Sequence, residues 1–127
     1  MLLALALLLA HGEIVWPPHS PNLPLFEGGS VFNLNGGDAA LANASAHATS
    51  SALIVAMGER LGGRQGMWMT TGVYAGLKLV HETFLHNGSG PEVRTDLASS
   101  IGVAVTTAGI YELFHSLGWL QWSKPSG

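Results

Sequence analysis

The stretch Leu61–Gln65, which reads Leu-Gly-Gly-Arg-Gln, decides the fold because it divides the longest helix-forming region of the sequence. Two adjacent glycines end a helix readily, since glycine adopts the left-handed backbone conformation found at helix C-termini. Upstream, an alanine-rich segment begins at Asp38, which follows two glycines and suits a helix N-cap. The sequence therefore predicts one helix over Asp38–Leu61 and a second helix over Gln65–His86.

A third helix is predicted after the turn Asn87–Gly90, whose Asn-Gly-Ser-Gly sequence ends the second helix. This helix starts at Pro91 or Thr95, because proline suits the first helical position, and it ends near Leu117, just before a glycine. We therefore expect an all-α domain over residues 38–118, folded as a three-helix antiparallel bundle.

Small residues recur at helical spacing on all three predicted helices. Such stripes let helix backbones approach closely, so we expect them at the helix contacts, and they could also support a homo-oligomer. On this basis, replacing Gly102 with leucine is expected to disrupt packing through steric overlap. The stripes consist of Ala44, Ala48, Ala52, Ala56, Gly72, Gly76, Ala98, Gly102, Thr106 and Gly109.

The chain outside the helical domain divides into three parts. Residues 1–10 form an apolar leader that resembles the core of a secretory signal peptide or a short anchor, because it is too short to span a bilayer. Residues 11–37 form a Pro- and Gly-rich arm that is expected to be extended. Residues 119–127 form a C-terminal tail. The leader predicts a location in the cell envelope, either periplasmic or membrane-associated.

The composition favours a membrane surface or an envelope protein as the partner. Charged residues make up 10% of the chain, against about 25% in an ordinary soluble domain. Serine, threonine and glycine at the helix centres make insertion marginal, which favours a water-exposed or membrane-surface bundle over three membrane spans. The five Lys and Arg residues form no basic stripe, which argues against nucleic acid as a partner. The absence of cysteine excludes disulfides, thiolate nucleophiles and lipoprotein acylation.

Four of the ionisable residues stand out for their positions in the apolar helices, where a charge is costly unless it has a partner. His47 lies about two turns into the first helix, Glu82 lies about one turn before the end of the second, and Asp96 lies early in the third. Consecutive antiparallel helices would bring these three residues together at one end of the bundle and leave Glu59 at the other.

This cluster has two interpretations. As a site, one histidine and two carboxylates could act in acid–base catalysis or hold a divalent metal, which makes His47, Glu82 and Asp96 the candidate catalytic residues. As a structural element, the same residues would hydrogen-bond one another and fix which helix packs on which. An open cleft would favour the first interpretation, and a sealed cluster would favour the second.

No metal ligand or cofactor is assigned from the sequence. His81 and His86 are five residues apart, whereas two zinc-binding histidines on one helix face must be four apart. Lys78 with Glu82, and Glu112 with His115, have the spacing of helix-surface pairs and are expected to be solvated.

Three stretches carry a family resemblance: His47-Ala48-Thr49-Ser50-Ser51-Ala52, His81-Glu82, and Asp96-Leu97 followed closely by Gly102. Their polar positions resemble those of the YfiM-type periplasmic proteins over about residues 44–113. That family has a histidine followed by small residues on a first helix, Lys-Glu late on a second, and Asp-Leu opening a glycine-bearing third; the VanZ-like membrane proteins are similar in outline. The chain departs where His81 replaces the lysine, where Ser100 replaces a second aspartate, and where the lipoprotein cysteine is absent. The resemblance implies an envelope location and no particular reaction.

The sequence leaves three functions open. The first is a non-enzymatic accessory or interaction protein at a membrane surface. The second is a small metal- or carboxylate-dependent hydrolase that uses the histidine, glutamate and aspartate cluster. The third is a binder of an apolar ligand, with a pocket between arm and helices that is lined by Trp16, Phe26 and Trp68.

Overall fold

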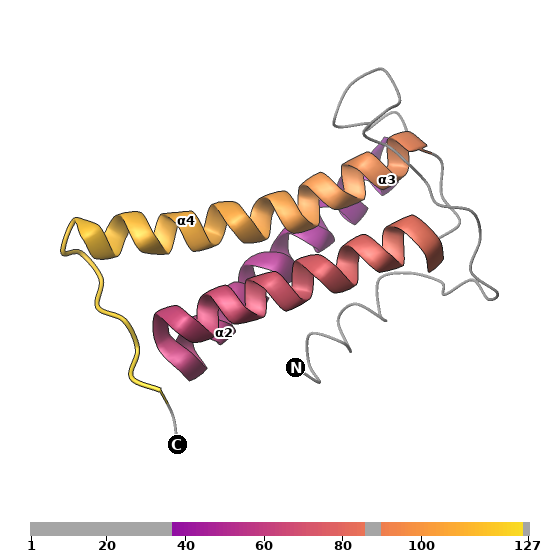
Figure 1. The fold of residues 1–127 in the computed structure, drawn as a ribbon. Coiled ribbons are helices and arrows are strands. Elements are labelled where there is room, and N and C mark those ends of the chain that lie inside the picture. The colour runs from indigo at the N-terminus through magenta and orange to yellow at the C-terminus, as the bar shows by residue number, and fades with distance from the viewer. Residues whose placement is uncertain (1–36, 86–89, 126–127) are drawn as a thin grey trace.

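The computed structural model describes residues 37–85 and 90–125, and every regular element in these ranges is helical (Figure 1). The predicted all-α class is therefore confirmed for the described residues. The predicted leader and residues 11–36 of the arm, with Trp16 and Phe26, lie outside them. The elements are α2 (Asp38–Val80), the π-helical turn η2 (His81–Leu85), α3 (Gly90–Leu97), the π-helical turn η3 (Ala98–Gly102) and α4 (Val103–Ser116).

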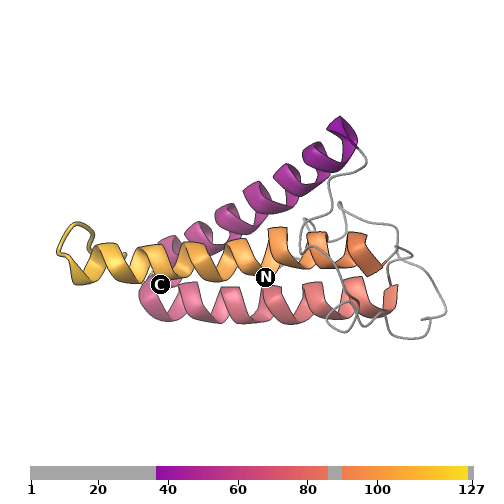
Figure 2. The same cartoon turned by 90° about the horizontal axis from the view of Figure 1, so that it is seen from above.

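Helix α2 consists of two arms that meet at Gly63. This glycine has φ 60° and ψ −148°, a conformation that side-chain-bearing residues rarely adopt, and it reverses the chain direction. From here on, the first arm means residues 38–62, and the second arm means residues 64–85, which comprise the rest of α2 and η2. Neither is the Pro- and Gly-rich arm of residues 11–37. Figure 2 shows the two arms joined at one end and diverging toward the other. The boundary predicted from the paired glycines is thus confirmed.

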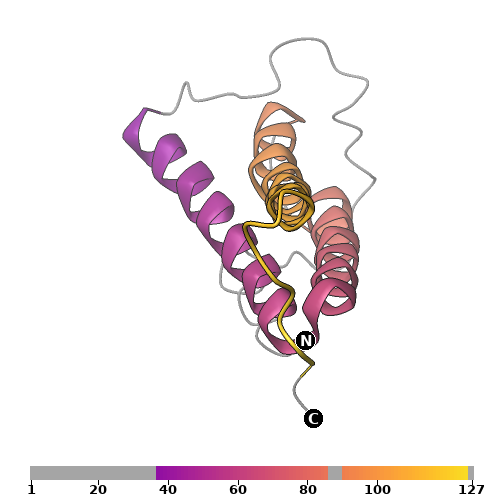
Figure 3. The same ribbon diagram turned by 90° about the vertical axis from the view of Figure 1, so that its left-hand side faces the viewer.

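The elements α3, η3 and α4 form a continuous helical segment that packs against α2. Figure 3 shows α4 end-on, between the first and second arms. Gly118 has φ 75° and ends the segment, as the sequence predicted. The Gly118 N–H donates to the His115 carbonyl and the Trp119 N–H donates to the Phe114 carbonyl, which is the Schellman arrangement of a helix C-terminus.

The two arms of α2 approach most closely beside the Gly63 turn. A Cβ atom built on Gly58 would lie 2.6 Å from Thr70 Oγ1 and 2.8 Å from the Gly66 carbonyl oxygen. A side chain at Gly58 would therefore push the two backbones apart, so this glycine has a steric role in the fold.

The predicted glycine contacts are wrong. Gly72, Gly76, Gly102 and Gly109 are exposed, and a Cβ added at any of them meets no atom within 4 Å. Helical spacing shows that small residues share a face, but it does not show which face turns inward. On α4 the inward face carries the fully buried Ala104 and Ala108 instead.

The burial pattern of the described residues is inverted relative to a water-soluble protein. Buried polar or charged residues outnumber buried apolar ones, twelve to seven. The apolar core is small and comprises Ile54, Val55, Met67, Tyr74, Ala104 and Ala108. Meanwhile, large apolar side chains are exposed on both arms and on α4, including Leu53, Leu61, Val73, Leu79, Val105 and Leu113.

Within residues 37–85 and 90–125, one helix is long and apolar enough to cross a membrane. It covers Val93–Ser116, and its most apolar window has a mean hydropathy of 1.4. Only 22% of that window is buried inside the protein. A core helix of a soluble protein is mostly buried, so the exposure of this helix agrees with the inverted burial pattern.

Candidate functional site

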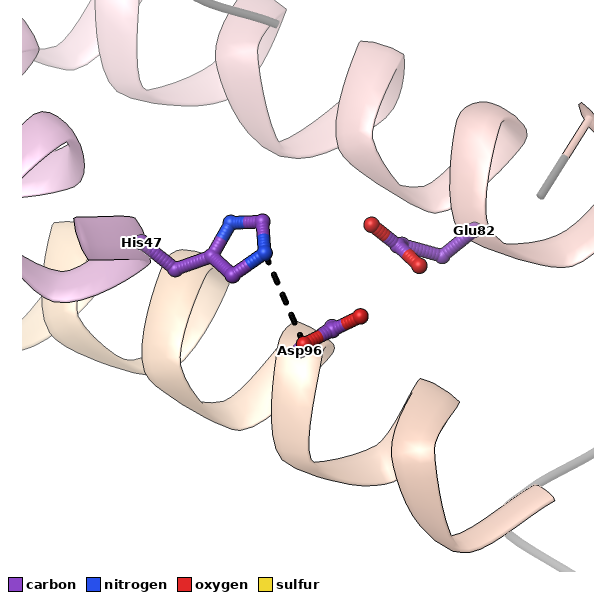
Figure 4. A group of neighbouring side chains, drawn as sticks. All are labelled: His47, Glu82 and Asp96. Carbon is purple, nitrogen blue, oxygen red and sulfur yellow. Dashed lines mark ion pairs between the residues drawn. The ribbon is translucent and has the colours of Figure 1, made fainter. Parts of the chain in front are cut away.

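His47, Glu82 and Asp96 converge, as the sequence predicted (Figure 4). His47 comes from the first arm, Glu82 from η2 and Asp96 from α3. One donor atom from each residue lies within 4.8 Å of the other two, and His47 Nε2 is 3.5 Å from Asp96 Oδ1. Three helical segments that are distant in sequence therefore contribute one side chain each to a common point.

The cluster is sealed from solvent. The exposed fractions of His47, Glu82 and Asp96 are 2%, 1% and 5%. An open surface depression on η3 and α4, which is lined by residues such as Ala98, Gly102 and Ile110, contains none of the three. Because substrate cannot reach a sealed cluster, this closed geometry favours the structural interpretation over a hydrolase active site.

Each carboxylate in the cluster is held by a further side chain. The Asn43 amide donates to Asp96 Oδ1 at 2.9 Å, and the Lys78 ammonium donates to Glu82 Oε1 at 2.8 Å. His81 Nδ1 lies 3.4 Å from the same Glu82 oxygen. These contacts orient both carboxylates and place a positive charge beside Glu82, which offsets the cost of burying it.

The expectation that Lys78 and Glu82 form a solvated surface pair is wrong. Lys78 pairs with Glu82 as its spacing predicts, but both side chains are 1% exposed, so the pair is not a solvated surface feature. The signal for its burial is the series Met67, Thr71, Tyr74 and Lys78, which follows one inward helix face with steps of three and four residues. Sequence reasoning also missed Asn43 as a partner of Asp96.

Two π-helical turns flank the cluster. Glu82 belongs to η2, and Asp96 lies two residues before η3. The hydroxyls of Ser99 and Ser100 donate to the carbonyls of Thr95 and Asp96, one turn back along the helix. Hydroxyl bonds of this kind compete with the backbone ladder, and π turns within helices are frequent at functional sites.

Glu59 lies at the other end of the molecule, as predicted, and it anchors the C-terminal tail. The backbone N–H of Ser123 donates to Glu59 Oε1 at 2.7 Å, and the Ser123 hydroxyl donates to Oε2 at 3.0 Å. The Trp122 ring stacks on His115 with ring centroids 4.7 Å apart. The tail therefore crosses the Gly63 turn, where the Ser123 carbonyl leaves no space for a side chain.

Glu112 joins the second arm to α4 at the same end. It accepts from Arg64 Nε at 2.6 Å and from the Trp68 indole N–H at 2.7 Å. These bonds come in addition to the electrostatic interaction between Glu112 and His115. They also give Trp68 a polar partner, while the other two residues of the predicted apolar pocket lie outside the described ranges.

Comparison with known proteins finds no matching family model, no matching characterised protein and no matching solved structure. The resemblance to the YfiM-type proteins therefore stays a prediction.

Proposed function

We propose that the chain is a non-enzymatic accessory protein embedded in a membrane of the cell envelope. The inverted burial pattern carries this proposal. In water, exposed leucine and valine side chains combined with buried charges would be unfavourable on both counts. In a bilayer the same arrangement is favourable, because apolar side chains face lipid and ionisable residues face the bundle interior.

The length of the helix Val93–Ser116 supports the proposal. Its 24 residues correspond to about 36 Å at 1.5 Å per residue, and the hydrocarbon core of a bilayer is about 30 Å thick. Because this helix packs against α2, both arms of α2 would share the bilayer with it. We propose that the three segments act as one antiparallel three-helix bundle within the membrane.

Because two of its charged residues point inward, the second arm keeps an apolar outer surface over more of its length. Lys78 and Glu82 interrupt the apolar sequence of the second arm, but both point into the protein. The residues beside them on the outer face, Leu79, Val80 and Phe84, are exposed and apolar. The lipid-facing surface of the second arm would therefore continue past its charged residues.

Aromatic residues at the end with the Gly63 turn fit a membrane–water interface. Trp68, Trp119 and Trp122 lie at this end together with Arg64 and Glu112, and the first two are well exposed. Tryptophan is enriched where the bilayer meets water, because its ring is apolar and its N–H requires a polar partner. This end would lie at one membrane surface.

Alkaline extraction of membranes from the native host provides the first test. An embedded protein stays in the membrane pellet at high pH, whereas a protein bound only at the membrane surface is released. Full release into the supernatant would contradict the proposal.

Cysteine labelling provides a second test, because the chain has no cysteine and every introduced thiol is unique. Three positions lie on exposed faces about ten residues along their helices from the end with the Gly63 turn: Leu53→Cys, Val73→Cys and Val105→Cys. Two exposed positions lie close to that end: Gln65→Cys and Ser116→Cys. In membranes, a water-soluble maleimide should label the two end positions and spare the three central ones until detergent denaturation. Equal labelling of all five positions would contradict embedding.

A further inference from the structure

We infer that His47, Glu82 and Asp96 form a binding site for one divalent transition-metal ion, for which Zn²⁺ is the probe. The three donors come from separate helical segments and meet within 4.8 Å. A nitrogen donor with two carboxylate oxygens is a donor set that zinc accepts in proteins.

The observed distances are close to those that zinc requires. Zinc binds nitrogen and oxygen at about 2.0–2.2 Å, so tetrahedral ligand atoms lie roughly 3.3 Å apart. His47 Nε2 and Asp96 Oδ1 are already 3.5 Å apart. The remaining separations are at most 4.8 Å, so zinc binding would require these side chains to move closer together.

Electrostatics provide an independent argument. Glu82 and Asp96 are both buried, and their oxygens lie within 4.8 Å of one another, where two like charges repel strongly in a medium of low dielectric constant. A cation bound between them converts this repulsion into attraction. Lys78 contributes one positive charge beside Glu82, and a divalent ion would act on both carboxylates together.

The surrounding hydrogen bonds resemble the outer shell of a metal site. Asn43 donates to Asp96 Oδ1 and Lys78 donates to Glu82 Oε1, so each carboxylate is fixed by a neighbour on α2. Outer hydrogen bonds of this kind orient metal ligands, and their loss typically lowers metal affinity 10- to 100-fold. Asn43→Ala should therefore weaken zinc binding by about that factor without removing a ligand.

The experiment measures zinc bound to the full chain, purified in detergent without a histidine tag. After incubation with Zn²⁺ and dialysis, elemental analysis should find about one zinc per chain. His47→Ala and Asp96→Asn should lose this zinc, whereas Glu112→Gln and His115→Ala, which alter a carboxylate and a histidine at the opposite end, should retain it. Retention of zinc by both cluster variants would overturn the inference, as would a wild-type protein that holds none.

X-ray absorption at the zinc edge of the wild-type protein keeps the inference testable even if the cluster variants do not fold. The expected spectrum has one imidazole and otherwise oxygen ligands. A spectrum with two or more imidazoles would place the metal elsewhere in the chain and would overturn the assignment. Because the readout is ligand identity, it does not depend on whether the protein proves to be membrane-embedded.

Discussion

Lys78 shows at the scale of one residue how the interior of this protein is held together. It is among the largest fully buried side chains, and its ammonium group contacts the equally buried Glu82. Removing one partner of a buried ion pair leaves an uncompensated charge, whereas removing both can be nearly neutral. The pair is thus sensitive to single substitution in a way that surface pairs are not.

We expect Lys78→Met to lower the free energy of unfolding by about 3–5 kcal/mol. The double variant Lys78→Met/Glu82→Gln should recover much of this loss, because no buried carboxylate is then left without its cation. Denaturant titration in detergent, followed by circular dichroism, measures both values. Lys124→Met, an exposed position in the tail, is the control and should leave stability unchanged. A single variant as stable as this control would contradict the buried pair.

Gly58 provides a steric test at the same scale. An alanine there would place its Cβ 2.6 Å from Thr70 Oγ1, so Gly58→Ala should destabilise the protein by about 1–3 kcal/mol through overpacking. Gly62→Ala is the matched control, since its Cβ would meet no atom within 4 Å. Thermal unfolding of the two variants should separate them clearly, and equal melting temperatures would show that the arms do not touch at Gly58.

At the scale of the element, the outward face of η3 and α4 leads to a prediction about Gly102→Leu that is opposite to the one made from the sequence. Gly102 is exposed with open space around it, so Gly102→Leu should leave stability unchanged or slightly higher through better helix propensity. Ala108→Leu, six residues further along and fully buried, should be strongly destabilising. A large loss of stability in Gly102→Leu would show that this face packs against another helix.

The helix ends and the polar cluster could be predicted because their signals are local. Gly63 breaks α2 and Gly118 ends the last helix, each through a backbone preference that needs no knowledge of the rest of the chain. The start of α2 near Asp38 was also predicted, but the N-cap is Gly37 and not Asp38, which is already the first helical residue. The meeting of His47, Glu82 and Asp96 followed from counting helical turns between these ends.

Which side of each helix turns toward the interior could not be predicted, because it depends on packing between segments. The glycine stripe at Gly72 and Gly76 has the spacing of a helix contact and yet lies on the outside. The attachment of Ser123 to Glu59 joins residues 64 positions apart, and nothing in the tail sequence indicates that partner. Such contacts arise only when the arms are placed in space.

At the scale of the whole molecule, the distribution of charge predicts an orientation in the membrane. The end with the Gly63 turn carries Arg60, Arg64 and Lys124, whereas the first 59 residues contain no lysine or arginine. Near the opposite end the basic residues are Arg94 and the buried Lys78. Since basic residues are retained on the cytoplasmic side, the Gly63 turn and the tail should face the cytoplasm.

Labelling of intact cells tests this orientation with two single-cysteine variants at opposite ends. A membrane-impermeant maleimide should label Asp38→Cys directly, and it should label Gln121→Cys only after the inner membrane is opened. Replacing Arg60, Arg64 and Lys124 together with glutamine removes the charge bias, so Gln121→Cys should then become labelled in part of the population. If the triple replacement leaves the labelling pattern unchanged, some force other than the basic residues sets the orientation. If Gln121→Cys is labelled first in the unmodified background, the proposed orientation is inverted.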